Sequence, residues 1–410
     1  GRVGRVVKKI NSDLAGDDEM KVKLGDISVL INGDRGKNYP SQGDIVPDGD
    51  IPFVNAGHIS GQNISFDKMN YISKEKYDQL NSGKFQKGDI LYCLRGSLGK
   101  KAVIKDAMNG AIASSLVIIR TNPEIVDVDY LMFALDSPSI QEQLIKANNG
   151  SSQPNLSAAS VREYAVDLPD RRMQEEIVEK LSKARNIIKK RQQELQKLDT
   201  LIKSRFTEMF GDPIVNSLHW QEELIGDSNF VTKLAGFEYT QYIHYEESGD
   251  VVMVKAQNVK NGKLNRKDLS YISNEVSNSL PRSQLAVGDV VMTYVGANIG
   301  DVAVIDDEYK YHLAPNVAKI RPNAEKYNSV YFMYMLMFLN SYIVGNSADT
   351  AKAALGMERI RKLKIFAPPM ELQNQFATFV HSIDKLKATI QKSIDEAQTL
   401  FDSLMQEYFG

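Results

Sequence analysis

The sequence predicts an α/β (α+β) protein: two similar mixed α/β modules separated by two long helices that form an antiparallel coiled coil, with pseudo-two-fold symmetry. Three observations predict this fold. A block of sequence recurs about 200 residues downstream, each copy contains short β-rich runs, and a heptad pattern closes each copy. A period this long indicates duplicated domains, because the repeats of solenoid proteins are roughly 20 to 50 residues long.

The duplication becomes visible when residue numbers are subtracted. Five blocks of similar sequence recur in the same order at a nearly constant offset, which indicates duplication rather than chance. The matching blocks are 49–54 with 249–254, 71–73 with 271–273 and 88–91 with 288–291 at an offset of 200, 130–132 with 331–333 at 201, and 208–211 with 407–410 at 199.

Each module is predicted to combine short strands with a few helices. Residues 22–168 hold β-rich runs cut by Gly, Asn and Pro, at 27–31, 52–54, 89–94, 102–104 and 115–119. Two helical stretches, roughly 73–82 and 128–148, join these strands. The second copy, 224–367, repeats the pattern with strands at 251–254, 289–294, 302–305 and 317–320.

A proline at the end of each module, Pro169 and Pro368, predicts the start of a long helix. In both helices apolar residues alternate by four and three, which is the a/d spacing of a coiled coil. The first helix carries the chain from one module to the next, so the second can pair with it only by running back. The predicted seam residues are Ile177, Leu181, Ile188, Leu195, Leu198, Ile202, Phe376, Phe379, Ile383, Leu386, Ile390, Leu400 and Leu404.

The composition is that of an ordinary globular protein, with 42% hydrophobic and 25% charged residues. The single cysteine, Cys93, excludes an internal disulfide framework, fits a reducing cytoplasm and is expected to be a small buried residue. The longest apolar run, 330–344, falls short of the roughly 18 residues that span a bilayer and predicts a buried helix. Residues 1–19 lack the apolar core of a secretory signal and are expected to be a flexible leader or tag.

The sequence motifs of common enzyme classes are missing. The five histidines have no metal-ligand spacing, and there is no Cys-x-x-Cys, His-Glu-x-x-His or P-loop pattern. We therefore expect no catalytic residue and no metal ligand in this chain. Gly96, Gly99, Gly296 and Gly300 follow strands but precede further strands, so they predict tight turns rather than a dinucleotide site.

The loops that follow the predicted strands carry side chains suited to hydrogen bonding with the polar edges of bases. Arg pairs with guanine and Asn or Gln with adenine in the major groove, while Lys and Ser contact phosphate. Any one of these residues is equally typical of an ordinary loop, and only the set indicates DNA binding. The candidate DNA-binding residues are Arg35, Lys37, Asn38, Tyr39, Asn55, His58, Arg95, Ser97, Lys100, Ser152, Gln153, Asn155, Lys255, Gln257, Asn258, Tyr294, Asn298 and Asn316.

Two further observations bear on the ligand. Strand cores and turn glycines match between the copies, whereas residues 34–40 stand opposite an unrelated segment, 235–239. One fold with two sets of loops predicts one kind of ligand read in two versions. The net charge of −2 is unusual for a DNA-binding protein, because such domains usually carry a basic footprint. Either the positive charge is unevenly distributed, as at 189–191, or a partner supplies part of the contacts to nucleic acid.

In the order of its motifs, the chain resembles a specificity subunit of a type I restriction-modification system. The motifs lie at 23–26, 33–40, 88–99 and 150–156, followed by a helix entry of the form Leu-Pro-x-x-x-x-Gln-x-x-Ile from Leu168 to Ile177. The second module departs from these motifs at 352–356 and 367–373. The resemblance implies target-recognition domains at 20–168 and 212–367, followed by conserved long helices at 169–211 and 368–410.

The resemblance implies a non-catalytic, sequence-specific DNA-binding subunit in which each domain reads one half of a bipartite asymmetric site. The implied partners are double-stranded DNA, two methyltransferase (M) subunits and restriction/translocase (R) subunits, with no membrane. The helices are expected to set the spacer between the half-sites and to dock the methyltransferase subunits. No cofactor is expected in this chain, whereas S-adenosylmethionine, ATP and Mg are expected in the partner subunits. Two alternatives stay open: a protein-binding scaffold with two modules on a coiled-coil spacer, and an enzyme with an unrecognised site.

Overall fold

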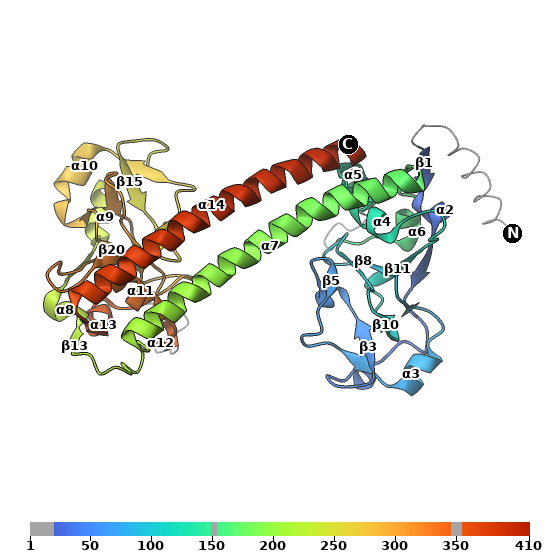
Figure 1. Cartoon of the computed structure of the whole chain (residues 1–410), viewed down its shortest axis with the longest axis horizontal. Helices are drawn as coiled ribbons and strands as arrows, with labels where there is room; N and C mark the ends of the chain where they lie inside the picture. The colour runs from blue at the N-terminus through green and yellow to red at the C-terminus, as the bar shows by residue number, and fades with distance from the viewer. Residues whose placement is uncertain (1–19, 149–153, 346–354) are drawn as a thin grey trace. The chain divides into compact units, whose positions relative to one another are not determined.

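The computed structural model describes residues 20–148, 154–345 and 355–410 (Figure 1). The chain divides into two compact units, one formed by Gly1–Arg191 with Ser393–Gly410 (unit 1) and one by Gln192–Lys392 (unit 2). Two helices of 40 residues, α7 (Arg171–Phe210) and α14 (Met370–Phe409), each contribute one end to each unit.

Unit 1 is built on two four-stranded sheets. The first has the order β2-β11-β8-β9 and is antiparallel throughout. The second has the order β6-β3-β10-β7, and β3 and β10 run parallel. The strands are β2 (Ser28–Asn32), β3 (Ile51–Val54), β6 (Tyr71–Ile72), β7 (Lys84–Phe85), β8 (Ile90–Cys93), β9 (Lys101–Val103), β10 (Gly110–Ile112) and β11 (Leu116–Thr121).

Short elements complete module 1 around these sheets. An antiparallel pair, β1 (Met20–Lys23) and β12 (Ala165–Leu168), brings the two ends of the module together directly before α7. A two-stranded hairpin joins β4 (Ile59–Ser60) to β5 (Asn63–Ile64). The helices are α2 (Leu24–Ile27), α3 (Lys74–Gln79), α4 (Val128–Ala134), α5 (Pro138–Ala147) and α6 (Ala158–Arg162), with 3-10 turns η1 (Gln42–Asp44) and η2 (Ala56–His58).

Unit 2 repeats this architecture. Its four-stranded sheets have the orders β14-β23-β20-β21 and β18-β15-β22-β19. The strands are β13 (Glu222–Leu224), β14 (Phe230–Lys233), β15 (Val251–Val254), β16 (Val259–Lys260), β17 (Lys263–Leu264), β18 (Ser270–Ile272), β19 (Gln284–Leu285), β20 (Val290–Thr293), β21 (Val302–Val304), β22 (Tyr311–Leu313), β23 (Val317–Arg321) and β24 (Lys364–Phe366). The helices are α8 (Ile225–Ser228), α9 (Gly236–Tyr242), α10 (Asn274–Ser279), α11 (Ser329–Phe338), α12 (Asn340–Gly345) and α13 (Met357–Arg361), with 3-10 turns η3 (Ala256–Asn258) and η4 (Pro281–Ser283).

The predicted duplication is confirmed at the level of strand register. In unit 1, Ile119 pairs with Leu30 on one side and with Ile90 on the other. In unit 2, Ile320 pairs in the same way with Val231 and Val290. The two modules therefore share one topology, as the constant offset predicted.

Two predicted helices are each broken into two. The stretch 128–148 forms α4 and α5, because Ser137 caps α5 and Pro138 occupies its first turn, where a missing N–H costs nothing. The apolar run 330–344 likewise forms α11 and α12. Helix α11 is buried as expected, whereas in α12 Tyr342 is exposed.

An ion pair with a deeply buried carboxylate fixes the sheets of both modules at equivalent positions. In unit 1 the guanidinium of Arg120 donates twice, at 2.8 Å each, to the carboxylate of Asp89. In unit 2 Arg321 contacts Asp289 in the same two-pronged manner, at 2.6 and 2.8 Å. Each aspartate is 1% exposed, so the arginine and the backbone N–H groups around it offset the cost of burying the charge. The Gly-Asp motif of each copy is therefore a structural feature.

A buried glutamine locks each long helix to its module. In unit 1 Gln174 accepts from the backbone N–H of Asp127 at 2.8 Å and donates to the carbonyls of Ile125 and Pro169. The equivalent Gln373 forms the same three bonds in unit 2, and both side chains are at most 1% exposed. The glutamine of the helix-entry motif thus ties the first turn of the helix to the helix that follows the main sheet.

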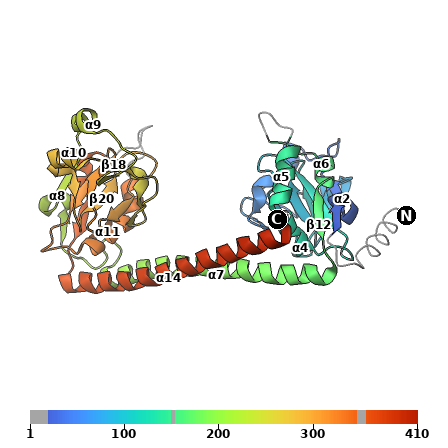
Figure 2. The same ribbon diagram turned by 90° about the horizontal axis from the view of Figure 1, so that it is seen from above.

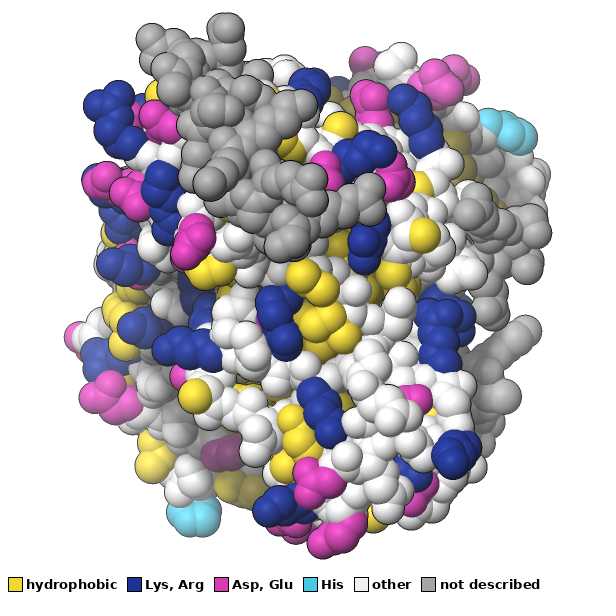
Figure 3. Space-filling model, turned by 90° about the vertical axis from the view of Figure 1, so that its right-hand side faces the viewer, with side chains coloured by type: hydrophobic (Ala, Val, Ile, Leu, Met, Phe, Trp, Pro, Cys, Tyr) yellow, Lys and Arg dark blue, Asp and Glu magenta, His cyan; other side chains and the backbone are white. Residues whose placement is uncertain are grey.

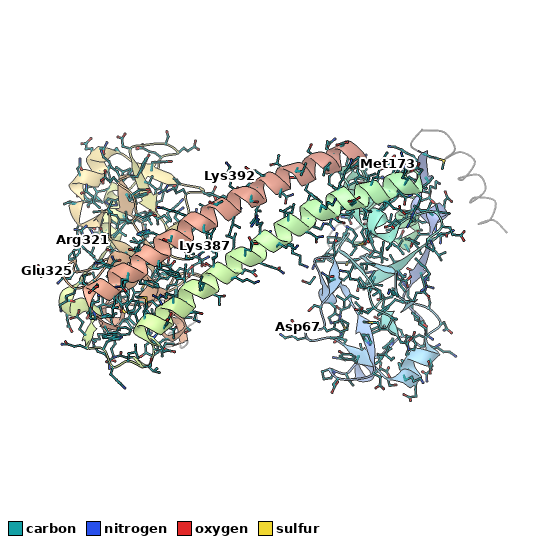
Figure 4. All side chains as sticks on the ribbon, viewed as in Figure 1. Asp67, Met173, Arg321, Glu325, Lys387 and Lys392 are labelled. Carbon is teal, nitrogen blue, oxygen red and sulfur yellow. The ribbon has the colours of Figure 1, made fainter. Side chains whose placement is uncertain are left out.

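The helices α7 and α14 run antiparallel within each unit, as predicted. Low residue numbers of α7 meet high numbers of α14 in unit 1, and the order is reversed in unit 2, where Lys387 extends from α14 (Figure 4). The contacts are Lys180 with Tyr408 and Arg185 with Phe401 in unit 1, and Asp199 with Lys387 and Phe206 with Phe376 in unit 2.

The predicted seam is right for most of α7 and partly wrong for α14. In α7, Ile177, Leu181 and Ile202 are buried, while Ile188, Leu195 and Leu198 are half-buried. In α14, Phe376, Ile383 and Ile390 are buried, but Leu386 and Leu400 are 47% and 53% exposed. The buried positions that replace the predicted ones are Val380, Ile394 and Met405, with Phe379 and Leu404 left half-buried beside them.

The error in α14 has a physical cause. A step of three and a step of four both return to one face of a helix, because a turn holds 3.6 residues. At positions 379 and 380, 400 and 401, and 404 and 405, both neighbours are apolar, so spacing alone does not select between them. Lys387 takes the seam position next to Leu386, where its ammonium group meets Asp199.

Two smaller predictions are confirmed. Cys93 is buried in β8. The four turn glycines have positive φ angles, from 76° at Gly99 to 113° at Gly296, a region that residues with a Cβ rarely enter.

Candidate nucleic-acid interface

Three strand ends meet at one edge of module 1, around residues 113–115. The backbone N–H of Ala113 donates to the last residue of β3, and the N–H of the residue after β8 donates to Ser115, both at 2.8 Å. The hydroxyl of Tyr39 accepts from the N–H of Ser114 at 3.4 Å. This arrangement brings the predicted residues Tyr39, Asn55 and Arg95 together around one short segment.

Arg95 and Asn155 lie side by side at this edge. They form an isolated β-bridge, and with Gly96 and Pro154 they line a surface hollow. Both side chains are exposed, as are those of Ser97 and Lys100 in the turn that follows β8. The predicted residues Ser152 and Gln153 lie outside the described part of the chain.

The loop after β2 presents Arg35 and Lys37 to solvent, with Asn38 half-buried. Its shape depends on Asp34, whose carboxylate accepts from the backbone N–H groups of Gly36 at 3.0 Å and Asn81 at 2.8 Å. These hydrogen bonds hold the pKa of Asp34 below its usual range. The carboxylate therefore stays charged and keeps the loop in one conformation.

The prediction for His58 is wrong. Its Nδ1 atom accepts from the backbone N–H of Asn55 at 3.1 Å, and the side chain is only 7% exposed. Burial also lowers the pKa of His58. The imidazole caps the turn η2 instead of facing DNA, whereas Asn55, which accepts from the N–H of Gly57, stays half-buried at the edge.

The prediction for Asn258 is wrong for the same reason. Its Oδ1 accepts from the N–H of Lys255 at 3.1 Å, and its Nδ2 donates to the carbonyls of Asn265 and Lys267. The side chain is 2% exposed and has used its donors and acceptor within the module. It is the counterpart of His58, so both modules cap the same turn with different side chains.

In module 2 the equivalent edge gathers around residues 314–316. The N–H of Tyr294 donates to the carbonyl of Asn316 at 2.9 Å, and the N–H of Ala314 donates to the last residue of β15 at 3.1 Å. Lys255 follows that strand, and its ammonium group donates to Ser270. The predicted residues Lys255, Tyr294 and Asn316 are thus brought together, while Gln257 and Asn298 lie exposed on the flanking turns.

Lys233 joins this group, and sequence reasoning missed it. Its ammonium group lies 5.4 Å from the ring centre of Tyr294, and the side chain is exposed at the end of β14. The pairing of β14 with β23 indicates its place, since Lys233 lies opposite Ala318, next to the loop that carries Asn316. Lys233 is the last residue of a strand, whereas the predicted residues follow the strands.

The two modules differ most in the segment that leads from the first strand of the first sheet, β2 or β14, into the second sheet. Module 2 has the helix α9 there, and Phe237 on it is 67% exposed. Glu238 fixes this helix by accepting from the N–H of Ala235 and from Arg282. Unit 1 carries the extended 34–40 loop at the same place, and Lys and Arg side chains are interspersed with acidic ones on the face of unit 1 seen in Figure 3.

The paired helices lie along one side of the module in each unit (Figure 2). Arg185 and Asp384 reach toward their modules, where they contact Gln62 and Lys263. Positions two residues further along a helix point roughly 200° away. Ile187 and Leu386 stand at such outward positions and are 45% and 47% exposed, and the helices also expose Leu400 in unit 1 and Leu201 in unit 2, by 53% and 46%.

Within the described ranges, no group of three or more His, Cys, Asp or Glu side chains is arranged to hold a metal ion. In those ranges no helix is long and apolar enough to cross a membrane.

Two copies of one α/β module, each with its own loops at the strand ends and its own long helix, define a duplicated recognition subunit. The chain belongs to the family of the type I restriction modification DNA specificity domain, whose model matches residues 17–198 and 231–398. The first matched region contains module 1 and the second contains module 2 from residue 231 onward, and each extends over most of the long helix that follows.

Similar proteins cover most of the chain. A putative type I restriction enzyme MjaX specificity subunit from Methanocaldococcus jannaschii is 20% identical over 86% of this chain and 85% of its own. The type I restriction enzyme MjaVIII specificity subunit of the same organism is 22% identical over 77% of both chains. The crystal structure of a type I restriction-modification system S subunit from M. genitalium aligns with a TM-score of 0.57, 16% identity and coverage of 96% and 97%. That structure shows a shared fold.

Proposed function

We propose that this chain is the DNA-recognition subunit of a type I restriction-modification complex, in which each module reads one half of a two-part site. One observation carries the proposal: two modules of a DNA specificity family share a frame but present different side chains at the same edge. Arg35, Arg95 and Asn155 stand at this edge in module 1. Lys233, Lys255 and Asn316 stand there in module 2, so the two half-sites differ in sequence.

Arginine and asparagine at the edge suit base readout in the major groove, where they pair with guanine and adenine. Lysines and backbone N–H groups would contact phosphates and set the register. The net charge of −2 implies that partner subunits contribute further phosphate contacts to the assembled complex. DNA binding by the complex should therefore weaken steeply with salt, and by the isolated chain it should be weak.

The experiment is to map methylated bases in DNA from cells that contain this chain and its methyltransferase. The proposal requires methylation at two short, different sequences separated by an unread spacer of fixed length. Replacing module 2 with that of a related subunit should change one half of the site and leave the other unchanged. Methylation without sequence preference, or salt-insensitive binding, would instead favour a protein-binding scaffold.

The outward side of the helices is proposed to dock two methyltransferase subunits. Two equivalent sets of exposed apolar side chains, one in each unit, would suit two copies of one partner. Leu386 is equivalent to Ile187, and Leu400 to Leu201, at an offset of 199. S-adenosylmethionine would belong to these partners, and ATP and Mg to the restriction/translocase subunits. Ile187→Ser with Leu400→Ser should remove one of two bound methyltransferase subunits, which sedimentation of the complex would measure. The unfolding temperature of the chain should stay unchanged.

A further inference from the structure

The contact between module 1 and its helices centres on one arginine. Arg185 of α7 donates to the side chain of Gln62, and its guanidinium lies 4.1 Å from the ring centre of Phe133 in α4. A second ring, Phe401 of α14, is 5.5 Å away. The arginine thus joins the hairpin β4–β5, the helix α4 and both long helices.

Asp136 provides the negative charge at this contact. One of its oxygens is 3.9 Å from the guanidinium of Arg185 and accepts from Gln62 at 3.3 Å. The other oxygen accepts from Lys101, whose side chain is only 4% exposed. Two cations and one carboxylate therefore share a partly buried network, and removing Asp136 would leave both cations without their common carboxylate.

Unit 2 solves the same contact with the opposite charge. The position equivalent to Arg185 is Asp384, which forms an ion pair of 2.9 Å with Lys263 of the hairpin β16–β17. Lys263 is equivalent to Asn63 in unit 1 by strand register. The helix therefore presents a cation to module 1 and an anion to module 2.

The partners change together with the helix residue. Lys101 is replaced by Val302, since both stand at the same register position of the sheet. Asp136 is replaced by Met337, and Phe133 by Tyr334, which packs on Phe376 at 5.5 Å. In unit 2, apolar residues thus stand in place of Lys101 and Asp136. The ion pair between Asp384 and Lys263 remains, with a negative charge on the helix where unit 1 has a positive one.

We infer that each module is matched by charge to its own long helix, with Arg185 selecting module 1 and Asp384 selecting module 2. If module 2 preceded α7, Arg185 would face Lys263 and would find Met337 in place of its carboxylate. If module 1 preceded α14, Asp384 would replace Arg185 beside Asp136, so that two carboxylates would share the one cation Lys101. Like charges at a partly desolvated contact are unfavourable in both cases. The two modules are therefore not interchangeable, although they share one fold.

This inference goes beyond the proposed function and does not depend on it, because the contact joins each module to its helices and uses none of the residues proposed to contact DNA. Its role is to position the module. The hairpin β4–β5 and α4 are both attached to Arg185, so the contact fixes the angle at which the module sits on its helices.

The test uses four full-length chains. The first is the native chain, and the second carries Arg185→Asp with Asp384→Arg. In the third, residues 20–168 and 212–367 exchange places, and the fourth adds both substitutions to that exchange. The second chain should unfold at a temperature lower than the native chain by at least about 4 °C, and the fourth should unfold higher than the third by a similar amount.

A matched control reverses a charge elsewhere on the same helix. Lys189 is exposed, and Lys189→Asp should shift the midpoint by less than about 1 °C. Hydrogen exchange localises the effect: in the second chain the amides of 59–64 and 128–136 should exchange faster than in the native chain. The inference is overturned if the third chain is as stable as the native one. It is equally overturned if the two substitutions fail to raise the midpoint of the third chain, including the case where both exchanged chains are unfolded.

Discussion

At the scale of single residues, the side chains that share a place in the two modules often do the same work with different chemistry. His58 and Asn258 both cap the turn after the first strand of the second sheet, one with an imidazole nitrogen and one with an amide oxygen. The sequence marked both as polar residues after a strand, which is correct. Whether such a side chain turns back to its own backbone depends on burial, and a pattern of residue types does not contain that information.

Lys319 is a residue-scale difference between the modules. Its counterpart Ile118 is an apolar residue in the middle of a strand, whereas the ammonium group of Lys319 is buried and donates to the carbonyls of Arg282 and Gln284. Burial lowers the pKa of Lys319 to about 8, against 10.5 for a free lysine. Between these two values the unfolded chain holds a proton that the folded chain has lost.

The contribution of Lys319 to stability should therefore rise with pH. Because the unfolded state binds more protons between pH 8 and 10.5, the free energy of unfolding gains up to about 3 kcal/mol over this interval. In Lys319→Met this gain should vanish. Urea unfolding of both proteins at pH 7.5 and 10.5 measures it, with the exposed Lys260→Met as control. Parallel pH curves for the parent and Lys319→Met would contradict the prediction.

At the scale of elements, the existence of the long helices was the easiest feature to predict, and the buried face of α14 was the hardest. Their existence followed from heptads and prolines, and the observed bounds, Arg171–Phe210 and Met370–Phe409, begin two residues or one residue after a proline. The face of α14 was misjudged at Leu400, whose neighbour Phe401 is also apolar, and at Leu386, where Lys387 takes the seam position. Aligning α14 with α7 removes part of the ambiguity, since Leu181 corresponds to Val380 and Leu195 to Ile394.

The glutamine at the start of each helix should be worth more than its exposed neighbours. Gln373→Ala leaves the N–H of Asn328 and the carbonyls of Lys326 and Pro368 without their partner in a buried site. We expect a loss of about 2 to 4 kcal/mol in the free energy of unfolding. Trp220, the only tryptophan of the chain, packs against the core of unit 2, so its fluorescence during urea unfolding reports the change.

The matched control for this measurement lies two residues further along the same helix. Gln375 is exposed, and Gln375→Ala should alter the free energy of unfolding by no more than about 0.5 kcal/mol. Equal effects of the two substitutions would show that the three hydrogen bonds of Gln373 contribute little, and that the motif is kept for another reason.

At the scale of the whole molecule, the duplication was readable from numbering alone because the offset between the copies stays between 199 and 201. The candidate edge was less accessible. Tyr39, Asn55, Arg95 and Asn155 are separated by up to 116 positions in the sequence, and only the sheet order brings their strand ends together. Lys233 shows the same limit, since its neighbours come from β23 and from the turn after β20.

The proposed spacing role of the helices gives a prediction at this scale. Removing one heptad from the middle of both α7 and α14 shortens each helix by about 10 Å, or roughly three base pairs of B-DNA. The preferred spacer between the two half-sites should shorten by that amount, as mapping of methylated bases would measure. Adding a heptad to both helices is the matched control and should lengthen the spacer. A spacer length that both changes leave unaltered would refute the spacing role of the helices.

The charge reversal between Arg185 and Asp384 also has a genetic consequence. A recombination event that puts a copy of module 2 in the place of module 1 and ends before codon 185 leaves the arginine facing Lys263, whereas one that ends inside α7 after that codon carries the matching aspartate along. Viable exchanges should therefore have their crossover points within the helix and not at the proline that begins it.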